Sequence, residues 1–417
     1  MKRIIFPLLT MIALMGCTTT ESSANPSQDS SITAEIATNG GIDRTTGYAE
    51  SYVATGSEMT LDLPGSVLNT ISCTTTEEIH SAFKNAKAGD KIVIKPGSYT
   101  GSNSQCGSSK AYFYISASGT KDNPIWVVNE SNKEVVLQGS SNMSDYVLYI
   151  TGDYVAVENI TFKTGNQGII LDNSNYSLIN NVEVYDIGQE AIHVRDGSSY
   201  TIIKNSFVHD TGHKNIKYGE GVYVGSDYKK WPENGGSYLK ECDYVQILNN
   251  TIGPNVTAEH IDLKEGSSYA YIIGNTFDAA GMTDILNGGL SFIDFKGNYA
   301  ECAYNWGDQN GNEYFENAFE VNDKWPEWGD YNNIHNNVIT FNDEFYNPNK
   351  IDVTMDLMVS GKLSSHTDDI DRDQWIVECN DQSKAEGQPD GTIVSQNIRI
   401  PENAKRMYNS SSRIKEY

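Results

Sequence analysis

The sequence predicts an all-β protein folded as a right-handed parallel β-helix, a solenoid in which each coil of chain stacks on the coil before it. Two repeated patterns predict this fold. The first is an alternation with apolar residues at the second and fourth positions and polar residues at the third and fifth. It occurs in residues 191–195, 221–225, 260–264, 292–296 and 318–322. Alternation with a period of two indicates half-buried strands, and its recurrence every 20–40 residues or so is typical of a solenoid.

The second pattern is a pair of recurring polar residues. Asparagine returns in short strands at Asn159, Asn181, Asn205, Asn250, Asn275 and Asn337, and a tyrosine often stands a few residues earlier, at Tyr154, Tyr176, Tyr200, Tyr244 and Tyr269. Stacked coils place such residues about 4.8 Å apart. Asparagine suits the turns because it tolerates left-handed φ and its amide can bond along the stack. The Val, Ile, Tyr and Phe content of the strands argues against leucine-rich or helical repeats.

The N-terminal segment predicts export. Residues 1–17 combine a basic start, a short apolar run and Cys17. The run is too short to cross a membrane, so we expect a bacterial lipoprotein signal with Cys17 as the lipidated first residue; a simple secretion signal is the alternative. Thr18 follows in place of Asp, which by resemblance to known sorting rules favours the outer membrane, facing the periplasm or the cell exterior. The lipid is the only membrane contact we expect.

The remaining chain divides into three parts. Residues 18–60, rich in Ser, Thr, Asn and Gly, are expected to be a flexible tether. Residues 61–345 form the β-helix domain: a capping box at Thr75 and Glu78 predicts a helix over 79–87 that covers its open N-terminal end. Strands are expected at 91–95, 113–116, 148–151 and 169–172. Wider repeat spacing predicts inserted loops at 209–240 and 278–291. Residues 346–417 are expected to form the last coils and an irregular cap.

The charge and the cysteine content of the chain limit the partners and the disulfides that we expect. The 417 residues carry a formal net charge of −25, which argues against a nucleic-acid partner, and we expect a monomer. Export permits disulfides. Without Cys17 there are five cysteines, and no pair has the spacing of a zinc finger. Cys73–Cys106 and Cys302–Cys379 are candidate pairs that would leave Cys242 free; other pairings stay open.

The repeated strands carry ionisable residues in three columns. In coil order the position before each strand has Glu190, Glu220, Glu259, Ser291 and Asn317, the first outward position His193, Tyr223, Asp262, Asp294 and Glu320, and the second Arg195, Gly225, Lys264, Lys296 and Asn322. A solvated face with ordinary salt bridges is the simplest interpretation. Three stacked glutamates repel one another, however, unless protons or a cation relieve them. Carboxylate oxygens suit Ca²⁺, so Glu190, Glu220, Glu259 and Asp262 are expected to hold calcium.

Two lysines in the second outward column suggest proton-transfer chemistry. A lysine among carboxylates keeps its charge, but a divalent cation opposes this and can make a neutral amine available. That arrangement suits β-elimination on a uronate sugar, in which the cation neutralises the substrate carboxylate and a base takes the C5 proton. Lys264 is the expected base. Lys296, with His193, Arg195 or Tyr223, is expected to bind the substrate carboxylate or assist the leaving oxygen.

Substrate contacts are expected beside this column. Aromatic faces with adjacent cations suit an anionic sugar chain, although packing within loops is an equally simple explanation. The residues concerned are Lys229, Lys230, Trp231, Lys324 and Trp325 in the loops, and Asp294 and Glu320 in the acidic column.

Residues 258–266, followed by 272–277, resemble the core of the pectate-lyase-like β-helix superfamily, and most closely the alginate lyase and chondroitinase B family (polysaccharide lyase family 6). That family has a calcium-binding acid five residues before a lysine base, a spacing that Glu259 and Lys264 match, and Glu220 resembles the acid of its preceding strand. The similarity covers about residues 90–340 as architecture and two or three strands as motif. It departs at Lys296, where the family has arginine. The resemblance implies a calcium-assisted lyase acting on an anionic uronate polysaccharide.

Three other functions remain open from the residues. A glycoside hydrolase could use Asp262, Asp294 and Glu320. A uronate C5-epimerase would share the proton abstraction. A non-catalytic glycan-binding β-helix should have interchangeable columns, whereas the acids and lysines here are localised beside the loops. The polymer, the endo or exo mode and the metal are not determined by the sequence.

Overall fold

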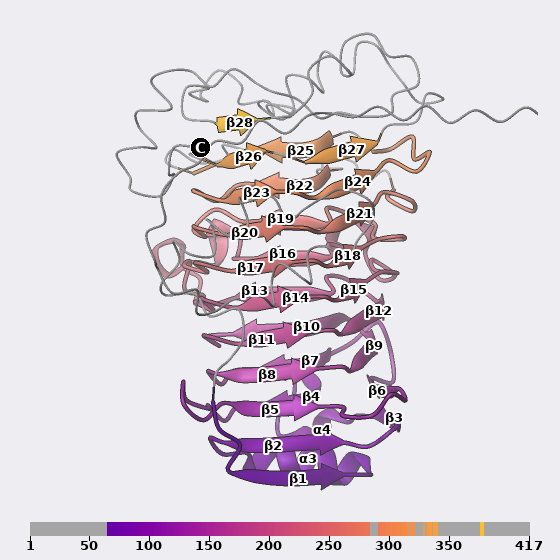
Figure 1. The fold of residues 1–417 in the computed structure, drawn as a ribbon, viewed down its shortest axis with the longest axis vertical. Helices are drawn as coiled ribbons and strands as arrows, with labels where there is room; N and C mark the ends of the chain where they lie inside the picture. The colour runs from indigo at the N-terminus through magenta and orange to yellow at the C-terminus, as the bar shows by residue number, and fades with distance from the viewer. Residues whose placement is uncertain are drawn as a thin grey trace, which may run out of the picture.

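Three parallel sheets stack along one axis in the computed structural model, which describes residues 65–283, 291–315, 317–321, 328–329, 332–335, 337–340 and 376–378. Figure 1 shows the coils rising from β1 at the indigo end to the orange strands at the other. The right-handed parallel β-helix predicted from the repeats is confirmed. Signal peptide, tether and Cys17 lie outside the described residues, as do Lys324, Trp325, Cys379 and most of the expected C-terminal cap.

The first sheet, sheet A, contains β1 (Asn69–Cys73), β2 (Asp90–Ile94), β5 (Ile125–Val128), β8 (Val155–Glu158), β11 (Leu178–Asn180), β14 (Ile202–Lys204), β17 (Gln246–Leu248), β20 (Tyr271–Ile273), β23 (Glu301–Ala303), β26 (Asn333–His335) and β28 (Ile376–Glu378). Sheet B contains β3 (Gly97–Thr100), β6 (Val135–Gln138), β9 (Thr161–Gly165), β12 (Glu183–Ile187), β15 (Phe207–Val208), β18 (Thr251–Ile252), β21 (Thr276–Asp278), β24 (Trp306–Asp308) and β27 (Val338–Thr340).

Sheet C carries the five repeated segments. Its strands are β4 (Ala111–Ile115), β7 (Tyr146–Ile150), β10 (Gln167–Asp172), β13 (Ile192–Arg195), β16 (Val222–Val224), β19 (Ile261–Leu263), β22 (Ser291–Phe295) and β25 (Asn317–Val321). Every neighbouring pair is parallel, and equivalent residues of the repeats are direct partners: Ile192 pairs with Val222, Val222 with Ile261, and Ile261 with Ile293. The register predicted from the alternation is therefore confirmed.

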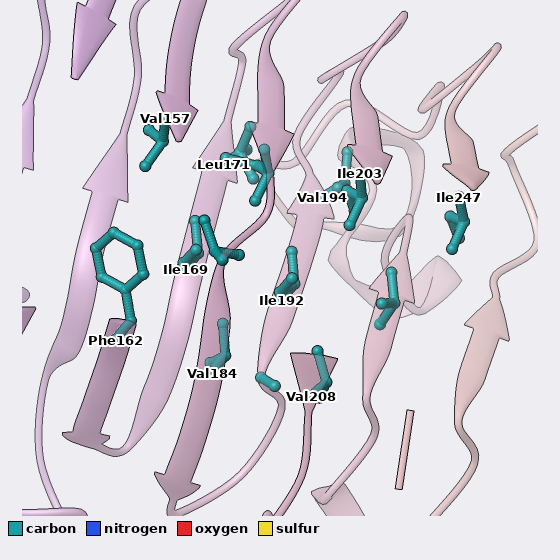
Figure 2. Packing of buried hydrophobic residues seen from close by; sticks show 14 of the residues in the cluster. Val157, Phe162, Ile169, Leu171, Val184, Ile192, Val194, Ile203, Val208 and Ile247 are labelled. Atoms are coloured by element: carbon teal, nitrogen blue, oxygen red, sulfur yellow. The ribbon is translucent and has the colours of Figure 1, made fainter. Parts of the chain in front are cut away.

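The core is a continuous aliphatic stack inside the coils. Figure 2 shows residues such as Ile169, Ile192 and Val208, from sheets C and B, pointing into the same interior. These three side chains are at most 1 % exposed. Burying an aliphatic side chain of this kind stabilises the fold by about 1.5–3 kcal/mol, so each coil is held mainly by contacts with the coils on either side.

The N-terminal helix begins earlier than expected. Helix α3 spans Thr76–Asn85, and the Thr75 side chain accepts a hydrogen bond from the Glu78 amide at 3.2 Å, as a capping residue does. Glu78 in turn accepts from the Thr74 amide at 2.6 Å, so the capping box closes one residue upstream of Thr75. Phe83 packs edge-on against Phe113 of β4, with ring centres 6.3 Å apart. The predicted cap over the first coil is confirmed.

Several short helical segments lie between the strands, three of them in the first inserted loop. A second N-terminal helix, α4, covers Asn103–Cys106, and the 3₁₀ turns η1 (Ile216–Tyr218), η2 (Tyr228–Lys230) and η3 (Pro232–Asn234) lie in the loop predicted at 209–240. Part of the loop predicted at 278–291 lies outside the described residues. No described helix combines the length and apolar character needed to cross a membrane.

The predicted Cys73–Cys106 disulfide is wrong. Both thiols are buried and unjoined, and Cys242 is also a free thiol. Cys106 lies on α4 and its Sγ donates to the Ala111 carbonyl at 2.9 Å, so the helix directs the thiol to the backbone of β4. The Cys302–Cys379 pair is not tested, because Cys379 lies outside the described residues.

The predicted tyrosine ladder is confirmed, and the predicted asparagine ladder is present in part: Asn159, Asn181 and Asn205 occupy left-handed turn positions, while Asn250, Asn275 and Asn337 belong to an internal ladder one position further along. Neighbouring rings from Tyr154 to Tyr299 stack with centres 4.7–5.1 Å apart, and each of these tyrosines has a positive φ. Stacking offsets the cost of that backbone conformation. A second ladder is internal: the Asn250 amide donates to Asn275 at 3.0 Å, Asn275 to Asn305 at 3.0 Å, and Asn305 to Asn337 at 2.9 Å. The same amides also donate to the carbonyls of Ile203, Ile247 and Ile272, which belong to strands of sheet A.

Replacing Asn275 with leucine should lower the free energy of unfolding by about 3 kcal/mol or more. The change removes the acceptor for the Asn250 backbone and side-chain amides and the donor to the Ile247 carbonyl, and buried groups without partners are costly. Urea unfolding measures the loss. The control is Asn180→Ala, which removes a half-buried amide on β11; its effect should stay near 1 kcal/mol. Equal losses in both variants would contradict a special role for the internal ladder.

Candidate active site

The outward face of sheet C gathers the ionisable residues that the sequence placed in columns. His193, Tyr223, Asp262, Asp294 and Glu320 are successive partners in one column. Lys264 and Lys296 follow β19 and β22 directly, two residues after Asp262 and Asp294. Successive side chains of a strand point to opposite faces of the sheet. Because the neighbours of these residues are buried in the core, the residues themselves face outward on the same side.

Asp262 lies between the two lysines. Lys296 Nζ is 2.9 Å from Asp262 Oδ1 and also contacts the Asp294 carboxylate, while Lys264 Nζ is 3.4 Å from Asp262 Oδ2. The exposure of these four residues is at most 8 %. The sequence predicts that Lys296 binds the substrate carboxylate, but the carboxylate beside it in the structure is that of Asp262 of the protein itself. Lys296 therefore already contacts two carboxylates of the protein, Asp262 and Asp294.

The two lysines and Asp262 stabilise one another's charged forms, whereas burial raises the pKa of Asp294 above its ordinary value. Burial alone would raise the pKa of Asp262, but Lys264 and Lys296 together lower it below its ordinary value. Burial alone would lower the pKa of Lys264, but the charge of Asp262 raises it above its ordinary value, and Asp262 and Asp294 do the same for Lys296. Lys264 thus carries its proton in the free protein, which bears directly on its expected role as a base.

Tyr223 and His193 adjoin the lysines. Lys264 Nζ lies 5.5 Å from the centre of the Tyr223 ring, and the Tyr223 and His193 rings meet edge to face at 4.1 Å. Tyr223 is partly exposed, whereas His193 is buried. Burial, supported by the charge of Asp262, holds the pKa of Tyr223 well above its ordinary value, so its hydroxyl is protonated.

The tautomer of His193 follows from one contact. Its Nε2 lies 2.9 Å from the Gly225 carbonyl, which can only accept, so Nε2 bears the hydrogen and Nδ1 has a lone pair. Nδ1 is buried without a hydrogen-bond partner among the described residues, 3.8 Å from Glu190 Oε1. Burial, with Arg195 nearby, holds the pKa of His193 well below its ordinary value. His193 is consequently neutral.

The three stacked glutamates are buried as a column. Glu190 accepts a hydrogen bond from Gln167 Nε2 at 2.5 Å, and Glu220 Oε2 is buried without a partner among the described residues. Burial raises the pKa of all three carboxyl groups: Glu190 above its ordinary value, Glu220 well above it with help from its two neighbours, and Glu259 to about 7. The repulsion predicted from the sequence is thus present, and protons or a cation must relieve it.

The expected calcium ligands fit the ion unequally. Asp262 is the least suited of the four, since a lysine contacts each of its oxygens and would compete with the ion. As the side chains stand, the described residues contain no group of three His, Cys, Asp or Glu that could hold a metal. The glutamate column still offers hard oxygen donors, including the unpartnered Glu220 Oε2. Calcium remains a prediction, confined to Glu190, Glu220 and Glu259.

Arg195 is held in a separate cluster. Its Nε and Nη2 bind the two oxygens of Asp172 at 2.5 and 3.2 Å, and its guanidinium lies 5.4 Å from the Tyr146 ring and 5.1 Å from the Tyr238 ring. Only 6 % of Arg195 is exposed. The expected catalytic helper therefore joins β10, β13 and the following loop, and nothing in its contacts directs it to Lys264.

Trp231 packs into its loop. It is 6 % exposed, its Nε1 donates to the Ser226 carbonyl at 3.1 Å, and its ring lies 6.4 Å from that of Trp328. Gly266 has φ of 91°, and a Cβ there would meet Trp231 at 2.6 Å. The open sugar platform expected at Trp231 is thus replaced by packing. Lys229 and Lys230 are exposed on η2.

The two acids expected to contact the substrate are both buried. Asp294 is committed to Lys296, and Glu320 is 8 % exposed at the β25 end of the column. Sequence reasoning missed two further residues. Gln167 stands one coil before Glu190 in the same column, so extending the alignment would have found it. Glu265 is fully buried and accepts from the Tyr228 amide at 3.0 Å; no repeat marks it.

Replacing Lys296 with methionine should lower the free energy of unfolding by about 3–5 kcal/mol, because Asp262 and Asp294 would face each other without their shared cation. Urea unfolding at neutral pH measures it. Adding Asp294→Asn to that variant removes the excess charge and should recover part of the loss. An unchanged unfolding midpoint in the single variant would contradict the proposed pairing.

Comparison with known proteins places this chain in a family. Residues 64–246 match the family described as Pel9A-like, right handed beta helix region. The crystal structure of an alginate lyase from Paenibacillus sp. str. FPU-7 is similar with 39 % identity and a TM-score of 0.61, over 66 % of this chain and 87 % of that one. No curated protein shows significant similarity.

Two structures are similar to this chain at lower sequence identity. Pectate lyase Pel9A has 14 % identity and a TM-score of 0.45, over 67 % of this chain and 70 % of that one. The family 6 alginate lyase AlyGC has 16 % identity and a TM-score of 0.39, over 64 % of this chain and 38 % of that one. The identity and coverage of the Paenibacillus enzyme carry the assignment: the chain belongs to the pectate-lyase-like right-handed parallel β-helix family of polysaccharide lyases.

Proposed function

We propose that this protein cleaves an anionic, uronate-containing polysaccharide by β-elimination at the Lys264–Tyr223 cluster. Alginate, named for the Paenibacillus relative, is the first polymer to test. The observation that carries the proposal is the contact of a buried ammonium with a partly exposed phenol: Lys264 Nζ lies 5.5 Å from the Tyr223 ring and 3.4 Å from Asp262. An ammonium, a phenol and a carboxylate, which differ in how readily they give up or accept a proton, therefore lie close together on the outer face of sheet C.

The elimination needs one base and one acid. The C5–H bond breaks and its electron pair forms the C4–C5 double bond, while the C4–O bond breaks and the leaving oxygen takes a proton. The sequence assigns Lys264 to the base. In the free protein Asp262 keeps Lys264 protonated, so it serves as base only after that influence is offset. While Lys264 stays charged, it is suited to act as the acid. A neutral neighbour such as His193 would then take the C5 proton.

Lys264→Ala should lower kcat/KM for alginate by at least about 100-fold, the usual range for a residue that transfers a proton. The rate of new absorbance near 235 nm, the signature of an unsaturated uronate, measures it. Lys163→Ala is the matched control, because Lys163 lies on sheet B beside the Tyr185 ring. Residual activity within tenfold of the wild type would remove Lys264 from the mechanism.

Added amines can separate the two roles of Lys264. If Lys264 is the acid, rescue of Lys264→Ala should follow the protonated fraction of the amine as pH changes. If it is the base, rescue should follow the free amine. The assignment preferred by the contacts of Asp262 is the acid, and rescue that tracks the free amine would overturn it.

Calcium assistance is part of the proposal. An ion held by Glu190, Glu220 and Glu259 would neutralise the substrate carboxylate and so acidify the C5 proton. The stacked buried carboxylates and the unpartnered Glu220 Oε2 support it. Chelation should abolish activity and calcium should restore it, with Glu220→Gln weakening metal uptake measured by elemental analysis. Full activity in chelator without bound metal would leave the column to be explained by protonation alone.

The product distinguishes the competing functions. A hydrolase using Asp262 and Asp294 is less favoured because both carboxylates are bound to lysines. It would release new reducing ends without absorbance near 235 nm. An epimerase would exchange the C5 hydrogen without shortening the polymer. Absorbance that rises with chain cleavage supports the lyase alone.

Export as an outer-membrane lipoprotein also remains a proposal, supported by residues 1–17. Labelled palmitate should enter the wild-type protein and not Cys17→Ser in a bacterial host. Incorporation that survives the substitution would contradict the anchor.

A further inference from the structure

We infer that Tyr114 and Tyr149 form a distal sugar-binding platform on sheet C, which holds the polysaccharide several units away from the point of cleavage. The inference rests on the proposed function, since it assigns the platform to the same substrate chain. Nothing in the sequence motifs marks these two residues: they precede the five repeats and belong to β4 and β7.

The two rings form a preformed, partly open surface. Their centres lie 5.2 Å apart with 21° between the planes, and the Tyr146 ring meets Tyr149 edge-on at 5.5 Å. All three tyrosines are half-buried. The Tyr149 hydroxyl donates to Asp172 Oδ2 at 2.9 Å, and the Tyr114 hydroxyl lies 3.1 Å from Thr151 Oγ1. The hydroxyls thus fix the rings before any ligand arrives, which limits the entropy lost on binding.

The platform continues the active-site column. Tyr114, Tyr149, Ile170, His193 and Tyr223 are successive partners on adjacent strands of sheet C. Strand spacing therefore puts Tyr149 about 10 Å from His193 and about 14 Å from Tyr223 at the backbone. A polysaccharide crossing the strands along this face would meet the phenol at the reacting bond first and the tyrosine pair farther along the chain.

The chemistry favours stacking on a sugar ring over ion pairing. Arg195, a buried cation nearby, has its guanidinium close to the rings of Tyr146 and Tyr238, and its N–H groups donate to Asp172 and to the Tyr146 hydroxyl. The exposed Lys110 has its Nζ 6.0 Å from the Tyr149 ring. Any contact that it makes with a sugar carboxylate would be exposed to solvent. An aromatic face is suited to the C–H face of a pyranose, so the binding contributed here should depend little on salt.

The tyrosines that stack in the turns differ in setting. From Tyr176 to Tyr269 each ring has a tyrosine on both sides and a backbone of positive φ. Those rings offset the cost of a turn. Tyr114 and Tyr149 lie within strands, and the column changes to Ile170 after them, so the regular geometry of the coil does not require aromatic residues there.

Affinity for oligosaccharides of increasing length tests the platform. The full chain carrying Lys264→Ala, for which the proposed function predicts binding without cleavage, is titrated by calorimetry with alginate oligosaccharides of about three to eight sugars. Affinity should rise with length in this parent. Adding Tyr149→Ala should lower the affinity for the longest oligosaccharides about fivefold to tenfold and flatten that rise. The loss should persist at high salt.

Two further variants separate stacking from folding. Tyr149→Phe keeps the ring and loses the bond to Asp172, so it should retain the rise with length. Tyr185→Ala removes a half-buried tyrosine that has a similar lysine contact on sheet B, with Lys163 Nζ 5.3 Å from its ring, and should also retain it. An undiminished rise in Tyr149→Ala, or an equal loss in Tyr149→Phe, would overturn the inference. Because binding is measured without turnover, failure of the lyase proposal would appear separately, as missing absorbance near 235 nm in the wild type.

Discussion

Parallel, in-register stacking of one coil on the next is the constraint on which the rest of this structure depends. Ile192, Val222 and Ile261 are direct partners in sheet C, and their side chains fill the interior together. A slip of one residue would turn this whole set outward and bury the acids and lysines in its place. The aliphatic column thereby determines where His193 and Tyr223 point.

Charge compensation is the second organising principle, and it operates across coils. Asp262 on β19 shares one oxygen with each lysine, and Lys296 closes the group through Asp294 on β22. In the glutamate column alongside, Glu190 accepts from the neutral Gln167, and Glu220 Oε2 is buried without a partner among the described residues. The face therefore has a neutralised half and an acidic half. The half that contains the lysines and aspartates holds proton-transfer groups in fixed positions. The half that contains the glutamates would be stabilised by added positive charge.

Much of this arrangement could be predicted from the sequence, because a solenoid converts sequence repeats directly into spatial neighbours. The strands of sheet C, the capping helix and the three ionisable columns followed from period and spacing alone. The position of Asp262 between the two lysines could not be predicted. The ion pairs of long side chains depend on interatomic distances, which the alignment of the repeats does not give. Trp231 and Cys106 were misjudged for a related reason: loops and short helices direct side chains through contacts, such as that of Trp231 with Gly266, which no periodicity marks.

The capping of the first coil has a consequence for solubility. A solenoid made of parallel strands ends in an open row of backbone donors and acceptors that another chain could extend. Helix α3 packs Ile79 and Phe83 over this end, and its own first turn is closed by Thr75 and Glu78. The described N-terminal end therefore presents a polar helix surface to its surroundings. Addition of copies is therefore blocked at the β4 edge of sheet C, which the helix covers, whereas β1 is the edge strand of sheet A at the same end.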